Sequence, residues 1–133
     1  MFREAYSLIR EILNDEDLNA YILDVTGKHL AVIDAGAKVT APAAVILFNG
    51  GDFSRRQNSN NEIGFTVSFA MPFWGAEAFL RCIDFADFAL PVFFDYKGRH
   101  NFILRANPSI NELDDSEGRL WTVDFALTVS VFL

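Results

Sequence analysis

The sequence is poor in cysteine, histidine and basic residues, and each shortage excludes a class of function. Its single cysteine cannot form an intrachain disulfide, and neither it nor the two histidines has a neighbour at the spacing of a zinc site. The 11 Lys and Arg residues are outnumbered by 18 Asp and Glu, which gives a formal net charge of -7. Because nucleic acids and anionic membranes attract basic surfaces, we expect no nucleic-acid specificity and no membrane partner.

Long apolar runs are also absent. No run reaches the roughly 20 residues that a membrane-spanning helix needs, and the segment starting at Met1 is amphipathic rather than a signal peptide. Apolar residues make up 51% of the chain and charged residues 22%, which excludes intrinsic disorder. We therefore expect one soluble domain, 1–133, made inside the cell.

Two segments show the alternation that is typical of strands with one buried face. Every second residue is apolar in 63–71 and in the C-terminal segment 120–133, and each apolar set must share one side of a strand. We therefore expect two long strands. The apolar positions are Ile63, Phe65, Val67, Phe69 and Met71 in one segment and Trp121, Val123, Phe125, Leu127, Val129 and Val131 in the other.

Two other segments have the 3.6-residue spacing of helices. Residues 2–13 place apolar side chains on one side and charged ones on the other, which predicts an amphipathic helix. Residues 75–90 predict a second helix, ended by Pro91, with two adjacent apolar stripes and a narrow polar strip. We expect this helix to lie on the sheet and to meet a second surface, such as another subunit. The stripes are Phe79, Ile83, Ala86 and Leu90, and Ala78, Cys82, Phe85 and Ala89.

The first third of the sequence is less regular. Residues 20–25 and 29–33 predict two short strands around a Gly-containing turn, while a helix over 18–23 is the alternative. Pro42 then introduces the short apolar run 43–48, which predicts a strand buried on both faces.

Polar segments are expected to connect these elements. Residues 49–62 are interpreted as a mobile arm between two paired strands. Residues 92–95 and 99–105 predict a hairpin, and Asn107–Pro108 begins an acidic loop that runs to Glu117. Together the elements predict an α+β fold, with a mixed, mainly antiparallel sheet and two helices packed on one face.

No group of residues indicates an active site. Cys82 lies among apolar residues of the predicted helix 75–90, where a thiol is more often a packing residue than a nucleophile. We therefore expect no catalytic residue, no metal and no cofactor. Two alternatives stay open: a small hydrolase using Asp95, His100 or Cys82, and a ligand-binding domain with an apolar pocket between the sheet and helix 75–90.

Five residues are predicted to contact an oligomer neighbour or another partner. The basic pair Arg55 and Arg56 stands beside Phe53 in the polar arm and could contact nucleic acid or an acidic partner; at this net charge a protein partner or simple solvation suits the pair better than nucleic acid does. Cys82 and Phe85 lie on the broad apolar flank of the predicted helix.

The order of elements resembles the tail terminator and tail-completion (head-tail joining) proteins of long-tailed phages. The similarity covers most of the chain. It rests on a first helix, the Pro-led run Ala41–Phe48, a polar arm, the strand Phe65–Ala70, a helix and a closing strand. The resemblance implies a ring oligomer, a hexamer in that family, which caps the tail tube and contacts the tail tube protein and the head-tail connector protein.

The same resemblance implies a structural virion protein of a phage or prophage. Such a protein is found in the tail, and in the host cytoplasm during assembly. No catalytic residue is carried over from the family. A closed ring needs two different contact patches on each subunit, and the sequence offers an apolar helix flank and a polar arm for them.

Overall fold

The computed structural model describes residues 2–53, 61–95, 103–115 and 118–131. Within these residues lie three helices and five strands. Their order along the chain is α1 (Phe2–Leu13), α2 (Glu16–Thr26), β1 (Ala31–Asp34), β2 (Ala43–Asp52), β3 (Asn61–Met71), α3 (Ala78–Asp95), β4 (Ile103–Asp115) and β5 (Gly118–Val131).

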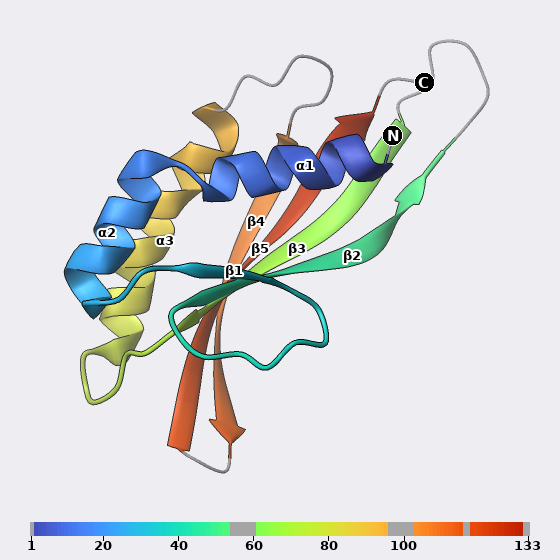
Figure 1. Ribbon diagram of the computed structural model, residues 1–133. Helices are drawn as coiled ribbons and strands as arrows, with labels where there is room; N and C mark the ends of the chain where they lie inside the picture. Colours follow the sequence, from blue (N-terminus) through green and yellow to red (C-terminus); the bar gives the residue numbers. More distant parts are fainter. Residues whose placement is uncertain (1, 54–60, 96–102, 116–117, 132–133) are drawn as a thin grey trace.

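The strands form one sheet with the order β1-β2-β3-β5-β4. Strands β1 and β2 are parallel, and the other three neighbouring pairs are antiparallel. The helices lie together on one face of the sheet (Figure 1). The predicted α+β fold with a mixed, mainly antiparallel sheet is therefore confirmed, with one more helix than predicted on the covered face.

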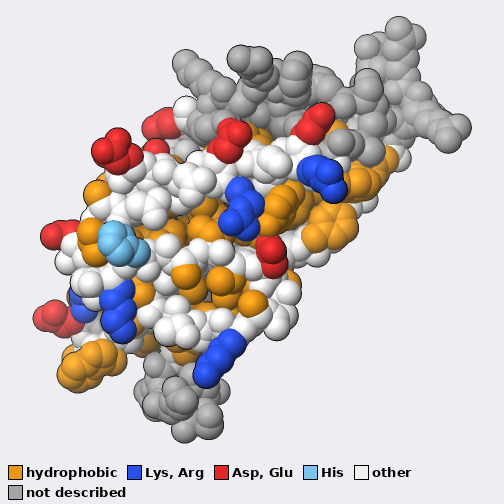
Figure 2. Space-filling view, viewed as in Figure 1, with side chains coloured by type: hydrophobic (Ala, Val, Ile, Leu, Met, Phe, Trp, Pro, Cys, Tyr) orange, Lys and Arg blue, Asp and Glu red, His pale blue; other side chains and the backbone are white. Residues whose placement is uncertain are grey.

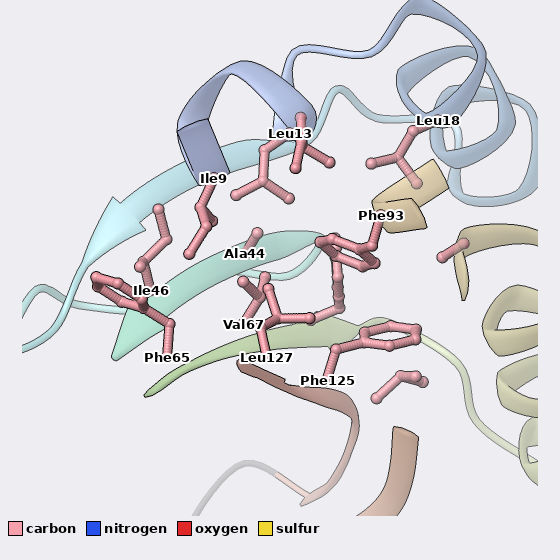
Figure 3. Close-up of a cluster of buried hydrophobic side chains, with 14 of the residues drawn as sticks. Ile9, Leu13, Leu18, Ala44, Ile46, Phe65, Val67, Phe93, Phe125 and Leu127 are labelled. Carbon is pink, nitrogen blue, oxygen red and sulfur yellow. The ribbon is translucent and has the colours of Figure 1, made fainter. Parts of the chain in front are cut away.

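The two alternating segments are the central strands β3 and β5, which pair with each other. Phe65 lies opposite Leu127, and Val67 lies opposite Phe125, so the apolar faces of both strands coincide. Every apolar residue of the two predicted sets is buried except Trp121, which is partly buried. Residues of α1 and α2 cover this face from above, as Figure 3 shows for several of them.

Four phenylalanines fill the space between α3 and the sheet. The Phe69 ring centroid lies 4.9 Å from that of Phe85 and 5.8 Å from that of Phe125, and Phe93 lies 5.0 Å from Phe125. All four side chains are buried, and Cys82 belongs to the same cluster. A packed core therefore occupies the place where the ligand-binding alternative expects a pocket.

The segment 16–34 contains helix α2 followed by the short strand β1. The prediction of a strand over 20–25 is wrong, and the alternative helix is correct. Asp15 caps this helix, because its carboxylate accepts a hydrogen bond of 2.9 Å from the Leu18 N–H. Gly27 ends it in the left-handed conformation, with φ 74° and its N–H donating to the Leu23 carbonyl.

Helix α3 runs through Pro91 to Asp95. The predictions that Pro91 ends the helix and that 92–95 form a strand are therefore wrong. Proline has no N–H, so the helical hydrogen bond to the Asp87 carbonyl is missing. The helix continues because Phe93, only 1% exposed, places its last turn in the core. Residues 99–102 of the predicted hairpin lie outside the described residues.

The acidic stretch after Asn107 is a strand and not the predicted loop. It belongs to β4, which pairs with β5 from Ile103 to Asp115. Pro108 is accommodated because β4 is an edge strand, where an N–H on the open side needs no partner in the sheet. Glu117 lies outside the described residues.

We expect Pro91→Ala to raise the free energy of unfolding by about 1–2 kcal/mol. A proline inside a helix costs about 3 kcal/mol, and part of the gain is offset by the greater entropy of the unfolded alanine chain. Pro91 is exposed, so little packing is lost. Urea unfolding followed by circular dichroism measures the change. Pro108→Ala, at an exposed edge position, should change it by less than about 0.5 kcal/mol. A less stable Pro91→Ala protein would mean that the ring of Pro91 supports the packing of Phe93.

Candidate functional site: two apolar surfaces

The polar arm predicted over 49–62 is partly sheet. Strands β2 and β3 remain paired as far as Asp52 and Glu62, with a register shift between Phe48 and Gly50. Gly50 has a φ of 102°, which a β-bulge accommodates with glycine at low cost. The expectation of a mobile arm is therefore corrected at both of its ends, and residues 54–60 lie outside the described residues.

The prediction that 43–48 is buried on both faces holds only for the first part of β2. Ala43 and Ala44 are buried, but Leu47 and Phe48 are exposed, Phe48 at 59%. Phe48 points to the helix face, since it lies opposite the buried Phe65, and among the described helices it contacts the first turn of α1 through Phe2. The covered face of the sheet thus ends in exposed aromatic surface.

Four phenylalanine rings form this surface in a continuous chain of edge-to-face contacts. The Phe2 ring lies 5.4 Å from Phe53 and 5.8 Å from Phe48, and Phe48 lies 5.6 Å from Phe65. Such pairs contribute about 0.5–1.5 kcal/mol each beyond the area they bury. The rings are therefore held in place although three of them are exposed.

A groove of about 410 Å³ opens between these rings and the first turns of α1. We call it the aromatic groove; it is lined by Phe2, Arg3, Tyr6, Phe48 and Phe65. Tyr6 is fixed at its outer end, because its hydroxyl donates to Asp34 at 2.5 Å and accepts from Arg10 at 2.9 Å. Among the described residues that line it, the groove is thus a shallow, almost wholly apolar surface with the cationic Arg3 at its edge.

We expect Gly51→Ala to displace Phe53 from the aromatic surface. An added Cβ would clash with the Phe53 ring and lie 2.9 Å from the Glu62 carbonyl oxygen, which should cost about 1–3 kcal/mol. Thermal unfolding measures the cost, and ring-to-ring nuclear Overhauser effects between Phe2 and Phe53 should disappear. Gly64→Ala is the matched control, because its Cβ would meet Asn49 at an ordinary 3.4 Å. Unchanged ring contacts in Gly51→Ala would contradict the expectation.

A second apolar surface follows the end of β3. We call it the tryptophan ridge; it comprises Trp74, Phe79 and Leu80, which are 85%, 49% and 60% exposed. Phe79 packs against Trp121, and the two ring centroids are 6.0 Å apart. Gly75, with φ 88°, turns the chain into α3 directly after Trp74.

Arg81 anchors the base of the ridge to the rest of the fold. Its guanidinium carbon lies 4.2 Å from the ring centroid of the buried Phe73, and its Nη2 donates a 2.8 Å hydrogen bond to the Val25 carbonyl. Because Val25 is in the last turn of α2, the arginine also meets the negative end of that helix. The ridge therefore projects from a fixed base.

The two surfaces lie at different ends of the molecule. The aromatic groove borders the first half of β3 at Phe65, whereas the ridge begins after its last residue, Met71. This part of the strand is roughly 20 Å long. Figure 2 shows hydrophobic surface at the upper right, next to the end of β2, and at the lower left, by the connection between β3 and α3.

The sheet face away from the helices has a different character. Its side chains are mostly short and polar, and they bond to one another across the strands. Ser68 donates to Asp124 at 2.5 Å, Asn111 donates to the other oxygen of Asp124 at 2.9 Å, and Asn49 donates to Thr66 at 2.6 Å. These polar groups bond to one another, and the exposed Leu47 and Leu113 add apolar side chains to the same face.

Of the five residues predicted as partner contacts, the three that the structure describes do not form one surface. Phe53 belongs to the aromatic surface, while Arg55 and Arg56 lie outside the described residues. Cys82 and Phe85 are fully buried between α3 and the sheet, so their predicted contact role is corrected to core packing. Burial raises the pKa of the Cys82 thiol to about 11.

The residues of the hydrolase alternative are also not assembled in the part of the chain that the structure describes. Asp95 is exposed at the end of α3, Cys82 is in the core, and His100 lies outside the described residues. Across the described ranges, no three His, Cys, Asp or Glu side chains gather to hold a metal ion. Nor does any helix within those ranges have the length and apolar character to cross a membrane.

Comparison with known proteins leaves the chain without an assigned family. No family model matches the sequence, and no curated protein matches it.

Proposed function

We propose that this protein is a structural subunit that assembles into a closed ring and caps a phage tail tube, joining it to the head connector. The observation that carries the proposal is the pair of exposed apolar surfaces, the aromatic groove and the tryptophan ridge, at different ends of one chain. Rings built from head-to-tail contacts need two such different patches on every subunit.

The order of elements supports the tail-tube part of the proposal. The chain has a first helix, α1, then the Pro-led strand β2, the long strand β3, helix α3 and the closing strand β5. This is the arrangement in which the sequence resembles the tail terminator family. As in that family, the partners of the ring would be the tail tube protein on one side and the connector protein on the other.

The acidity of the chain is compatible with the same role. A net charge of -7 makes identical subunits repel each other at long range, so a ring must be held by short-range apolar contacts. Exposed Trp and Phe side chains are the residue types that most often dominate such contacts.

Mass measurement and electron microscopy of the purified protein test the proposal. We expect a discrete oligomer, six times the 14.9 kDa subunit mass in a hexamer, and negatively stained rings that bind the ends of isolated tail tubes. A protein that stays monomeric at high concentration and does not associate with tail tubes would contradict it. A monomer that instead binds a fluorescent apolar probe, and loses it in Phe48→Asp, would favour the ligand-binding alternative.

A further inference from the structure

We infer that Asn49 is a site of spontaneous covalent modification, at which the side-chain amide is converted to a carboxylate through a succinimide ring. Asn49 is exposed in the second half of β2 and is followed by Gly50. The backbone nitrogen of the next residue can attack an asparagine amide, and glycine hinders this attack least because it has no side chain. The inference does not depend on the proposed ring assembly.

The β-bulge of β2 leaves Asn49 outside the regular pairing of the sheet. Phe48 lies opposite Phe65, and the next paired residue of β2 is Gly50. Asn49 is therefore the extra residue of the bulge. Regular pairing holds strand residues in one extended conformation, whereas closure of the succinimide ring requires backbone rotation at the asparagine. The bulge is thus the point in β2 where this rotation is least restrained.

Gly50 supplies both the attacking nitrogen and the room around it. A Cβ added at Gly50 would meet no described atom within 4 Å. The succinimide ring joins Cγ of Asn49 to the nitrogen of Gly50, so this open space lies next to the new bond. The Asn49 amide donates a 2.6 Å hydrogen bond to the Thr66 hydroxyl on the exposed face of the sheet, where water reaches the reacting group.

The reaction consumes water and no other reactant. Hydroxide from the solvent removes the proton of the Gly50 nitrogen, which then forms a bond to Cγ of Asn49. The Cγ–Nδ2 bond breaks, and Nδ2 takes a proton from water and leaves as ammonia, which restores the hydroxide. Water then opens the ring at either carbonyl. Opening at Cγ gives aspartate, and opening at the main-chain carbonyl gives isoaspartate, in which the backbone runs through the former side chain.

Both products change the aromatic surface next to the bulge. Each adds one negative charge to a chain whose formal net charge is already -7. Isoaspartate also lengthens the main chain between Phe48 and Gly50, which disturbs the register of β2 beyond the bulge. Phe53, whose ring lies 5.4 Å from that of Phe2, follows the bulge and is displaced with it. The modification therefore makes this surface change with the age of the protein.

Timed incubation of the full chain at mildly alkaline pH tests the inference. We expect an acidic form on ion-exchange chromatography, a carboxylate at Asn49 in peptide mass spectrometry, and labelling by an isoaspartyl methyltransferase. The rate in the folded protein should be within about tenfold of the rate in urea, because the sheet does not have to open. Asn49→Gln should not form the acidic product, since its longer side chain would have to close a larger ring.

Two asparagines of β4 are matched controls within the same molecule. Asn107 and Asn111 are exposed strand residues, as Asn49 is. Asn107 precedes Pro108, whose nitrogen has no proton to lose, and Asn111 is regularly paired with β5 and is followed by glutamate. Both should remain unmodified while Asn49 reacts. The inference is overturned if Asn49 reacts no faster than Asn111, or if folding slows its reaction by more than about tenfold relative to urea.

Discussion

Phe125→Asp should prevent folding. Phe125 is fully buried, with its ring 5.8 Å from that of Phe69 and 5.0 Å from that of Phe93, at the centre of the layer between α3 and the sheet. Truncation of a buried phenylalanine costs about 3–5 kcal/mol, and a carboxylate without a partner adds a further desolvation penalty. The total approaches the whole stability of a small domain, about 5–15 kcal/mol. Far-ultraviolet circular dichroism and gel filtration should show an unfolded or aggregated chain.

The neighbouring residue provides the matched control. Ala126 is exposed on the opposite face of β5, where it lies between Thr66 of β3 and Asn107 of β4. Ala126→Asp introduces the same group one position along the same strand, and we expect a cost within about 1 kcal/mol. A soluble, ring-forming Phe125→Asp protein, or a failure of both variants, would show that the inward face of β5 is assigned wrongly.

This pair of substitutions also shows why the central strands could be predicted from the sequence. Alternation along β3 and β5 is strict, and a shift of one residue would expose the entire apolar set. Long-range packing and local pattern therefore agree over Ile63–Met71 and over 120–131. The amphipathic helix α1 was predictable for the same reason, since its apolar spacing fits only one face.

The predictions failed where one residue serves two possible structures. The polar residues around Asp15 are typical of the end of a helix, and the Asp15 carboxylate also begins α2 by capping the Leu18 N–H. Gly27 was interpreted as part of a turn between strands, and it instead ends α2 in a left-handed conformation. Both residue types favour turns and helix ends equally, so the choice depends on burial of Leu18 and Ile22 in the core.

Pro91 and Pro108 show that tertiary structure can override a local sequence signal. Pro91 is a helix breaker by its local chemistry, but the burial of Phe93 two residues later outweighs the lost hydrogen bond. Pro108 argues against a central strand, and the sheet satisfies that restriction by placing β4 at the edge. Neither tertiary context is visible in a local sequence pattern.

The candidate surfaces were only partly predictable. Phe53 was assigned to a contact from its polar surroundings, but the groove depends on Phe2, Phe48 and Phe65, which sequence periodicity places in a core. Phe2 and Phe48 are exposed where β2 extends past the first turn of α1, whereas Phe65 is buried next to Phe48. A signal for the ridge was present in Trp74, a tryptophan between Pro72 and Gly75 in a turn, where a buried side chain is not expected.

The native thiol of Cys82 should react with iodoacetamide at pH 8 about 100-fold more slowly than an exposed thiol. Burial raises its pKa to about 11 against the positive charge of Arg81, which acts to lower it. The thiolate is the reactive form, and its fraction at pH 8 falls about tenfold for each unit of pKa. Ser7→Cys in a Cys82→Ala background supplies the exposed thiol on α1. If the alkylation rate of Cys82 were within tenfold of that of the control thiol, Cys82 would again be a candidate nucleophile.

The same pKa makes the fold sensitive to alkali. The unfolded thiol ionises near 9.0, whereas the folded thiol keeps its proton until about pH 11. The stability that the thiol contributes is therefore complete below pH 9 and is lost as the pH rises through 11, by about 3 kcal/mol in total. Tyr21, whose pKa is raised by burial and by Asp84, adds a loss of the same sign, but it is present in both proteins of the comparison. Urea unfolding between pH 8 and 11 should consequently give a flatter pH dependence for Cys82→Ala than for the wild type. Equal slopes would mean that water reaches Cys82 in the folded state, and that the layer between α3 and the sheet is less tightly closed than its packing of aromatic rings indicates.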